Sequence, residues 1–589
     1  MTVTERDDLG APARASGSNA SRNGGRGPRT LRVGLLLDGF SSVSWVERVL
    51  REIRDAGFAE LSLVVLNDAG APSSAPVARR GLAQRARTWY RNRSLLPYAL
   101  YERLDERRYG REGDPSRPAD LTPLLQGVPV VRVRPRQTRF CDYFEETDLR
   151  TIAGHDLDVA LRFGFRILKG DALRIARHGV WSYHHGDNTV NRGGPAGFWE
   201  VMERHETTGA VLQRLTEDLD GGEVLCRSYA STNPFSPTAN RSNFYWQAAA
   251  LLVPRLRSLA EQSGQEAAPP APAPTWTAYD RRLYTRPRAG ELLAHVPRLA
   301  WRLVRSKVRA LTTREQWILA YHLSPARGAA GDVPHGVFYR YRELQPPADR
   351  YWADPFPVFT GGRHHVFFEE HRYGEPHAHI AVVEIDASGM VGTPRVVLQR
   401  PYHLSYPSVF EWDGAWYMTP ESASRRAVEL YRATRFPDEW EHVGDLVSGL
   451  PAVDPTIARI HGRWWMFVGV LIEGASEATA LHLYSAESPL GPWTPHRGNP
   501  VKIDVRGARP GGRVFEVGGR YFRVGQDGAP SYGSGLRVFA IDELDDVTFR
   551  ETEVSRITPA WRKGLVGMHT LNASGGLTVI DARQVRRRI

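Results

Sequence analysis

The order of apolar and polar positions predicts an α/β region at the start of the chain. From Leu31 the sequence LRVGLLLDGF predicts a buried strand, the segment from Ser44 to Ala56 has the spacing of an amphipathic helix, and LSLVVLND predicts a second strand. GVPVVRVRP and HDLDVALRFGFRIL predict two more strands. Strands that alternate with helices are typical of a parallel sheet covered by helices. The turn after the first strand has no GxGxxG, which gives dinucleotide binding little support.

A repeat fills the second half of the chain. Four similar segments begin near Tyr351: ADPFPVFTGGRHHVFFEE, SYPSVFEWDGAWYMTPES, VDPTIARIHGRWWMFVGV and ARPGGRVFEVGGRYFRVGQD. Their prolines, Pro355, Pro407, Pro455 and Pro510, are 52, 48 and 55 residues apart. A period of this length, with two further strands in each unit, predicts a β-propeller. MHTLNASGGLTVIDAR forms a fifth unit, which we expect to close with strands around Trp317 to Tyr321 and Val337 to Tyr341.

A Pro/Ala-rich stretch separates the two regions. The residues from Glu266 to Trp276 are typical of a stiff, extended linker. A chain of 589 residues is also too long for a single core. We therefore expect a disordered tail over 1–30, an α/β domain over 31–262, a linker and basic helix over 263–315, and a five-bladed propeller over 316–589.

Charge and cysteine content narrow the function classes. A formal net charge of +11 favours anionic partners such as phosphorylated sugars, nucleic acid or a membrane surface, and no motif indicates specific nucleic-acid recognition. The two cysteines, Cys141 and Cys226, lack metal-ligand spacing, so we expect no metal site, no disulfide and a reducing, cytoplasmic compartment. Met1 to Arg29 has no apolar signal core, and no run of 18 apolar residues predicts a membrane span.

The segment after the linker predicts a basic amphipathic helix. GELLAHVPRLAWRLVRSKVRAL places Val304, Val308 and Leu311 on one side and Arg302 and Arg305 on the other. Such a helix can lie on an anionic membrane surface, here through 296–311. It can equally pack between two domains, and the sequence leaves both alternatives open.

One stretch carries residues typical of a catalytic site: GVWSYHHGDNTVNRGGPAGFWEVMERHETTGAVLQRLTEDLDGGEVLC, from Gly179 to Cys226. It resembles the N-terminal catalytic domain of the folate-dependent formyltransferases that act on methionyl-tRNA, glycinamide ribonucleotide and nucleotide sugars. That family has Asn-x-His at a strand end, an Arg-Gly turn, and an Asp before a Gly. His184 falls on the family histidine, Asp220 on the aspartate and Arg192-Gly193 on the turn, whereas Ser182 replaces the asparagine.

The resemblance implies a formyltransferase-like, Rossmann-like parallel fold, and a role for each matched residue. His184 would move the proton and stabilise the oxyanion, and Asp220 would orient His184. Ser182 brings a shorter, rotatable hydroxyl to the asparagine position, and backbone amides at the Gly193-Gly194 turn or the Asn188 side chain could replace the lost amide donor. The family's folate loop corresponds to 163–168, so Phe165, Arg166 and Leu168 are the candidate contacts for 10-formyltetrahydrofolate. The alternative for that loop is a buried strand followed by a turn.

The repeat region has a resemblance of its own. It resembles the five-bladed propellers of family 43-type glycoside hydrolases and, more closely, the propeller domain of glucosamine inositolphosphorylceramide transferases. Asp354 and Asp454 match two of the hydrolase carboxylates, but Arg509 stands where the general acid belongs. Glu421 and Asp527 are the candidates to face the same axial mouth. Because hydrolysis needs two cooperating carboxyl groups, we expect this mouth to bind or orient sugar.

Two functional hypotheses follow. In the first, the chain is a one-carbon transferase that moves a formyl group from a folate donor to the amine of an amino sugar or glycoconjugate precursor, with the propeller orienting the glycan. In the alternative, the chain is a glycan-binding or glycan-processing propeller protein whose formyltransferase-like domain is degenerate and not catalytic.

Overall fold

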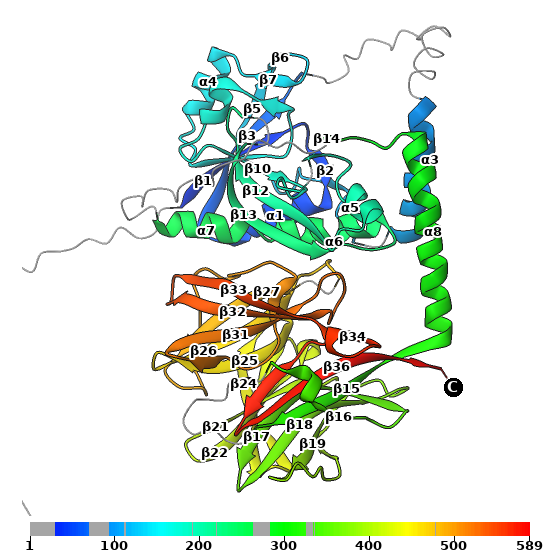
Figure 1. Ribbon diagram of the computed structural model, residues 1–589. Helices are drawn as coiled ribbons and strands as arrows, with labels where there is room; N and C mark the ends of the chain where they lie inside the picture. The colour runs from blue at the N-terminus through cyan, green and yellow to red at the C-terminus, as the bar shows by residue number, and fades with distance from the viewer. Residues whose placement is uncertain are drawn as a thin grey trace, which may run out of the picture.

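The computed structural model describes residues 30–69, 93–110, 113–190, 192–218, 221–262, 283–324, 334, 336–476 and 479–588. The described chain forms an α/β half and an all-β half, one above the other in Figure 1. Residues 1–29 of the predicted tail and the predicted linker from Glu266 to Trp276 lie outside the described residues. No helix among the residues in these ranges is long and apolar enough to cross a membrane.

The α/β half is built on a seven-stranded sheet in the order β13-β12-β10-β8-β1-β3-β5. The first five strands in sequence are parallel and the last two are antiparallel additions at one edge. The predicted parallel sheet is therefore present, with a mixed edge. Its strands are β1 (Leu31–Leu37), β3 (Ala59–Asn67), β5 (Val130–Val133), β8 (Val159–Arg162), β10 (Val180–His184), β12 (Thr207–Arg214) and β13 (Glu223–Ser231).

Helices and short strands surround this sheet. The helices are α1 (Ser44–Asp55), α3 (Leu96–Tyr109), α4 (Glu146–Ala153), α5 (Phe198–Glu203), α6 (Pro237–Ala249), α7 (Leu252–Gln262) and α8 (Ala289–Thr312), with 3-10 turns η1 (Arg93–Leu95) and η2 (Gly170–Arg174). Short strands pair as β2 (Ser41–Val43) with β4 (Pro118–Asp120), β11 (Arg192–Gly193) with β14 (Leu283–Tyr284), and β7 (Cys141–Tyr143) with both β6 (Arg136–Gln137) and β9 (Ile167–Leu168).

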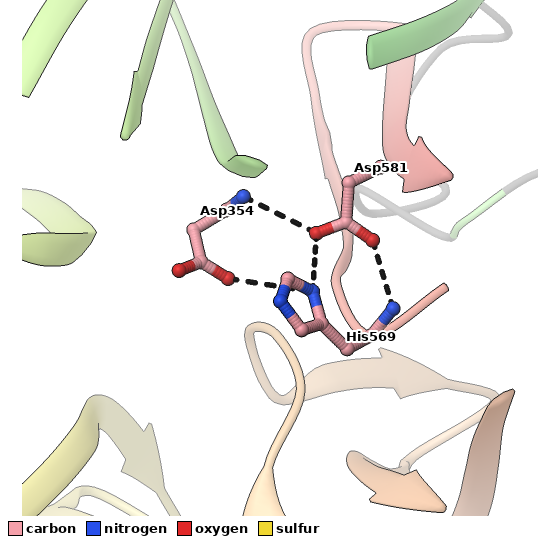
Figure 2. Close-up of side chains that lie close together, drawn as sticks. All are labelled: Asp354, His569 and Asp581. Atoms are coloured by element: carbon pink, nitrogen blue, oxygen red, sulfur yellow. Dashed lines mark hydrogen bonds and ion pairs between the residues drawn. The ribbon is translucent and has the colours of Figure 1, made fainter. Parts of the chain in front are cut away.

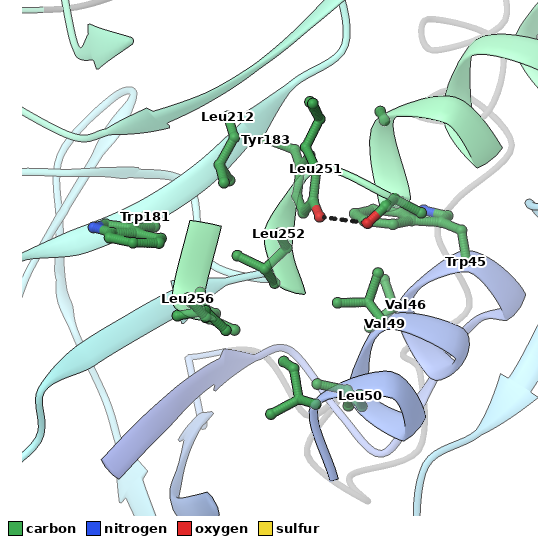
Figure 3. Close-up of a cluster of buried hydrophobic side chains, with 14 of the residues drawn as sticks. Trp45, Val46, Val49, Leu50, Trp181, Tyr183, Leu212, Leu251, Leu252 and Leu256 are labelled. Carbon is green, nitrogen blue, oxygen red and sulfur yellow. Dashed lines mark hydrogen bonds between the residues drawn. The ribbon is translucent and has the colours of Figure 1, made fainter. Parts of the chain in front are cut away.

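One face of the sheet is covered by α1 and α7. The apolar positions of α1 recur at helical spacing, so Trp45, Val49 and Leu50 all point toward the sheet. They meet Leu252 of α7 and the sheet residue Tyr183 in a buried cluster (Figure 3). Burying apolar side chains of this size contributes about 1.5–3 kcal/mol each, so this layer is a main source of stability for the α/β half.

The all-β half consists of five sheets, which gives it a propeller-like architecture. Blade 1 holds β17 (Arg350–Thr360), β18 (Arg363–Arg372), β19 (His379–Ile385) and β20 (Arg395–Leu398). Blade 2 holds β21 (Ser405–Trp412), β22 (Ala415–Glu421), β23 (Ala427–Arg435) and β24 (Glu439–Ser448), with η4 (Ala423–Arg425) between its strands. Blade 3 holds β25 (Ala452–Ile460), β26 (Arg463–Leu471), β27 (Thr479–Ala486) and β28 (Thr494–Pro495). Blade 4 holds β29 (Arg506–Pro510), β31 (Arg520–Asp527), β32 (Gly535–Leu544) and β33 (Phe549–Ile557), with β30 (Phe515–Val517) on β31.

The fifth blade joins the two ends of the propeller. The C-terminal strands β35 (Leu571–Ser574) and β36 (Leu577–Arg587) share a sheet with β15 (Thr313–Leu323), β16 (Arg342–Leu344) and the short strand β34 (Leu565–Gly567). β36 pairs with β15 over eleven residues, from Thr313 opposite Arg587 to Leu323 opposite Leu577. The predicted closing strand around Trp317 to Tyr321 lies within β15. The second predicted closing strand is wrong, because Phe338–Arg340 forms the 3-10 turn η3 and the outer strand begins at Arg342.

The two halves share a packed interface. Edge strand β13 faces the loop before β29, where the Val505 amide donates to the carbonyl of Tyr229 at 2.9 Å. The guanidinium of Arg506 lies 3.9 Å from the centre of the Tyr229 ring. Ile472 and Ile503 of the propeller belong to the same buried cluster as the core of the α/β half. The α/β half is thus packed against one end of the propeller.

Candidate functional site

The innermost strands of blades 1 to 3 share an unusual backbone feature. Asp354, Tyr406 and Asp454, each directly before the repeat proline, have φ values of +51°, +44° and +51°. The pairing with the next strand slips at the same place in each blade. Residues other than glycine adopt such angles at a cost, and they cluster where the backbone re-aims a side chain. The repeat therefore places three polar side chains at one end of the propeller axis.

Asp354 is held by the two neighbouring blades. Its Oδ1 accepts from the Thr570 hydroxyl at 2.6 Å, and its Oδ2 accepts from the Tyr406 amide at 3.3 Å. The Asp354 amide donates to Asp581 Oδ2 at 3.2 Å. These contacts link blades 5, 1 and 2 around the axis, so Asp354 is fixed in position and only 4% exposed.

A histidine joins this carboxylate to a second one. His569 Nδ1 pairs with Asp581 and lies 3.6 Å from Asp354 Oδ1, and the three side chains point toward one another (Figure 2). Trp317 stacks on the imidazole with ring centres 4.1 Å apart. Burial works to lower the pKa of His569, but Asp581 and Asp354 outweigh it and raise that pKa to about 9. Burial raises the pKa of Asp354 to about 7, while His569 opposes the shift.

These three groups also have the spacing of metal ligands. Their ligand atoms lie within 4.8 Å of one another, and the buried Glu429 forms a second such group with the exposed His442 and Asp445. The expectation of no metal site rested on the spacing of the two cysteines, which says nothing about sites built from histidine and carboxylates. The amides of His569 and Thr570 already donate to Asp581, at 2.8 and 3.0 Å. Both carboxylates of the group thus have hydrogen-bond donors from the protein itself.

Arg509 connects the remaining carboxylates of the axial mouth. Its Nη2 donates to Glu421 Oε2 at 3.0 Å and to Asp454 Oδ1 at 3.3 Å. Gln526 Nε2 adds a 2.6 Å bond to Asp454 Oδ2. Burial raises the pKa of Glu421 well above its usual value, and the charge of Arg509 works in the other direction. The cation that replaces the expected general acid thus holds two carboxylates.

A cavity of about 190 Å³ lies over this mouth, between the two halves of the molecule. Arg509, Gln526 and Tyr532 line it from the propeller, and Asn243 and Gln247 of α6 line it from the α/β half. The side-chain oxygens of Gln247 and Gln526 are buried and have no hydrogen-bond partner among the described residues. Their amide nitrogens already donate, to Tyr229 O and to Asp454 and Pro510 O, so the oxygens are fixed as acceptors. Both are acceptors without a described donor, on residues that line the cavity.

The predicted propeller residues do not all meet at this mouth. Asp354, Asp454 and Glu421 belong to it, as expected from the repeat. Asp527 instead pairs with Arg537 and Arg556, each at 2.9 Å, and supports the end of blade 4. His569, Gln526 and Tyr532 also belong to the site. Sequence reasoning missed them, although His569 stands in the fifth repeat unit.

Two of the predicted formyltransferase residues, Ser182 and His184, lie on β10. Ser182 accepts from Arg162 Nη2 at 2.9 Å, and Arg162 also donates to the carbonyl of Arg166 at 3.1 Å. His184 ends β10 and is partly buried. Asp220 lies outside the described residues, so its predicted pairing with His184 stays a prediction.

The predicted folate loop packs into the protein. Phe165 and Leu168 are 7% and 2% exposed and belong to a buried apolar cluster. Arg166 pairs with the buried carboxylate of Asp142 at 2.7 Å. These side chains therefore have structural partners, which agrees with the alternative of a buried strand followed by a turn. The predicted folate cofactor stays a prediction.

Sequence comparison connects the propeller to one family. Residues 343–573 match the family model described as glucosamine inositolphosphorylceramide transferase 1, N-terminal. A curated relative of that name from Oryza sativa subsp. japonica is 33% identical over 239 residues, which is 40% of this chain and 31% of the relative. One from Arabidopsis thaliana is 36% identical over 219 residues, covering 36% of this chain and 28% of the relative. The match thus spans about a third of the length of these relatives.

Solved structures resemble parts of this chain more distantly. A family 117 glycoside hydrolase from Zobellia galactanivorans is 15% identical, covers 45% of this chain and 90% of its own, and has a TM-score of 0.30. A glycinamide ribonucleotide transformylase from Symbiobacterium toebii is 14% identical, covers 42% of this chain and 93% of its own, and has a TM-score of 0.26. Likenesses at this level carry no argument about function.

These findings correct the first functional hypothesis. The sequence relatives are glucosamine inositolphosphorylceramide transferases, and they match through the propeller. The predicted formyltransferase activity is therefore wrong as the main function of this chain. The physical reason for the error is that a strand end, a turn and a helix with a few polar residues also serve ordinary packing, as 163–168 shows. The glycan-related alternative fits the relatives better.

Proposed function

We propose that this chain is a glycan-binding or glycan-processing protein that holds a sugar-containing substrate at the axial mouth of its propeller. One observation carries the proposal: Glu421 and Asp454, carboxylates from two different blades, meet the guanidinium of Arg509 below a cavity that Arg509 itself lines. Burying Glu421 and Asp454 is costly unless each is paired, and Arg509 provides a partner for both. Apolar residues would stabilise a purely structural core at lower cost than these charged groups, so their place below a cavity favours a binding role.

The chemistry of the lining suits a sugar. Side-chain amides and hydroxyls of the lining, such as those of Asn243 and Tyr532, accept hydrogen bonds from hydroxyl groups or an ammonium group, and Arg509 can donate to a ring oxygen or a phosphate. The cavity of about 190 Å³ is smaller than pockets for drug-sized ligands, which measure roughly 300–1,000 Å³. It fits one small polar unit. The names of the relatives mention glucosamine and inositolphosphorylceramide, and we propose an amino sugar or a sugar phosphate as the unit that enters here.

Binding or orientation of the sugar is favoured over hydrolysis. Glycoside hydrolysis requires an acid and a base that are both free to act on the scissile bond. Here the guanidinium of Arg509 donates to both Glu421 and Asp454. Asp354 is likewise bonded at both oxygens. The α/β half contributes residues of α6 and of the end of β13 to the lining of the cavity.

Titration calorimetry with glucosamine, its phosphate and short glucosamine-containing glycans tests this proposal. We expect binding to the full chain that falls at least tenfold in Glu421→Gln and in Asp354→Asn. Glu516→Gln changes an exposed carboxylate of the same propeller and is the matched control, which should bind like wild type. Binding that is unchanged in both mouth variants would contradict the proposal, as would the absence of binding to every sugar on a broad glycan array.

A further inference from the structure

Helix α8 has two apolar faces, and only one of them is used by the fold. Leu292 and Leu299, seven residues apart, are each 5% exposed and pack in a cluster with α3 and α5. Arg302 lies on the same side and donates to the carbonyl of Val201 at 3.2 Å. This face attaches the helix to the α/β half. The helix therefore packs on the α/β half through Leu292 and Leu299. The apolar side named from the sequence, with Val304, Val308 and Leu311, is a different face of the helix.

The opposite face carries an exposed apolar stripe. Its members recur at spacings of three, four and eight residues, which keeps them on one side of a helix. Their exposed fractions are Leu293 76%, Trp301 66%, Val304 52%, Val308 52% and Leu311 74%. From Val304 to Thr312 every residue is exposed, and Figure 1 shows α8 standing at the side of the molecule beside both halves. Exposing a tryptophan and four aliphatic side chains in one row is costly in water.

Basic residues flank this stripe. By helical spacing, Arg298, Arg305 and Arg309 lie along one border and Lys307 along the other. The described part of α8 contains one acidic residue, Glu291, in its first turn. An apolar stripe with cationic borders matches a surface whose interior is apolar and whose rim is anionic. That description fits a bilayer with acidic headgroups.

Helix α3 adds apolar side chains beside α8. Leu96, Leu100 and Leu104, four residues apart, are 49%, 61% and 58% exposed. The opposite side of α3, with Tyr98, packs in the same cluster as Leu292 and Leu299 of α8. Both helices therefore use one face for the same cluster and leave another apolar face exposed.

We propose that the exposed faces of α8 and α3 form a docking surface for an anionic lipid bilayer, on which α8 lies in the headgroup plane. The inference rests on exposure and charge, and it does not depend on the proposed sugar site. A second protein copy is a weaker candidate, because self-association would bring Arg298 and Arg305 of two copies together, whereas the acidic Glu315 is already paired with Arg309 at 3.2 Å.

Co-sedimentation of the full chain with vesicles tests the proposal. Wild type should bind phosphatidylcholine vesicles that contain about 30 mol% phosphatidylglycerol and should release them as salt rises toward about 0.5 M, since screening weakens surface attraction. Vesicles of phosphatidylcholine alone should bind at least tenfold less protein. Equal binding to both kinds of vesicle, or to neither, would overturn it.

Two pairs of variants identify the surface. Trp301→Glu with Val308→Glu should reduce binding to anionic vesicles at least tenfold. Its control, Val443→Glu with Val554→Glu, alters valines that are 52% and 50% exposed on outer propeller strands and should bind like wild type. Wild-type binding by the α8 variant would show that the lipid contact lies elsewhere.

The second pair separates local charge from net charge. Arg298→Gln, Arg305→Gln and Arg309→Gln together should weaken vesicle binding by about a hundredfold, because each basic group near the surface contributes about fivefold. The same number of charges removed at Arg459, Arg497 and Arg520, which are exposed propeller residues, should have a much smaller effect. If wild type forms concentration-dependent dimers that Trp301→Glu with Val308→Glu abolishes, the surface serves a second copy and the lipid proposal is wrong.

Discussion

The guanidinium of Arg509 donates to the carboxylate of Glu421 at 3.0 Å, and through the same group it holds Asp454. The two acids come from blades 2 and 3, whereas Arg509 lies on β29, the first strand of blade 4. The contact therefore joins three blades at a point that no local sequence pattern specifies.

Removing that cation should destabilise the propeller. Arg509→Ala leaves two buried carboxylates without their partner, and breaking a buried ion pair in this way costs about 3–5 kcal/mol. We expect a clear fall in the thermal midpoint measured by calorimetry. Burial raises the pKa of Glu421 well above its usual value, so protonation of Glu421 should reduce the deficit as the pH falls. Arg520→Ala, at an arginine that is 63% exposed, should leave the midpoint within about 1 °C, and an equal loss in both variants would contradict this account.

His569 should make stability depend on pH in the alkaline range. Its pKa in the folded protein is about 9, above the usual value of about 6.5, so the protonated form favours folding. That contribution is complete below about pH 6.5 and is lost as the pH rises through 9. A shift of this size corresponds to at most about 3 kcal/mol. Denaturation of wild type and His569→Asn at several pH values measures it, and parallel profiles for both proteins would contradict the assignment.

Gly474 should be needed for contact between the two halves. Its φ is +82°, and a Cβ at this position would lie 2.8 Å from the Trp246 ring of α6. Gly462 has the same φ of +82° and no atom within 4 Å of the corresponding Cβ position. Gly474→Ala should therefore lower the thermal midpoint more than Gly462→Ala, which reports the backbone strain alone. Equal effects would show that contact with Trp246 is not limiting.

The repeat made much of the propeller predictable. A turn glycine follows the proline by seven residues in each of the first three units, and the residues before Pro355 and Pro455 do reach the axial mouth. The fifth unit has no proline at the corresponding place, so His569 and Asp581 were not recognised by analogy. The segment from Val337 to Tyr341 has strand-like composition, but Phe338–Arg340 forms a 3-10 turn, and the Phe338 ring packs against Trp561.

The α/β half shows why local motifs can mislead. Alternating strands and helices predicted the parallel sheet correctly, because that signal is spread over many residues. The catalytic assignment depended on a few polar residues whose partners only the fold reveals. Ser182, for example, accepts a hydrogen bond from Arg162, and Phe165 and Leu168 face the core. The cavity over Arg509 could not be predicted, because it is formed by segments more than 250 residues apart in sequence, such as Asn243 and Arg509.

The most direct test of the central claim is a crystal structure of the full chain soaked with glucosamine 6-phosphate or a glucosamine-containing disaccharide. We predict ligand density in the cavity between α6 and the propeller, with ligand donors near Gln247 Oε1 and Gln526 Oε1 and a ligand acceptor near Arg509. Occupied density elsewhere on the protein, with this cavity left to solvent at saturating ligand, would contradict the claim that the axial mouth is the glycan site.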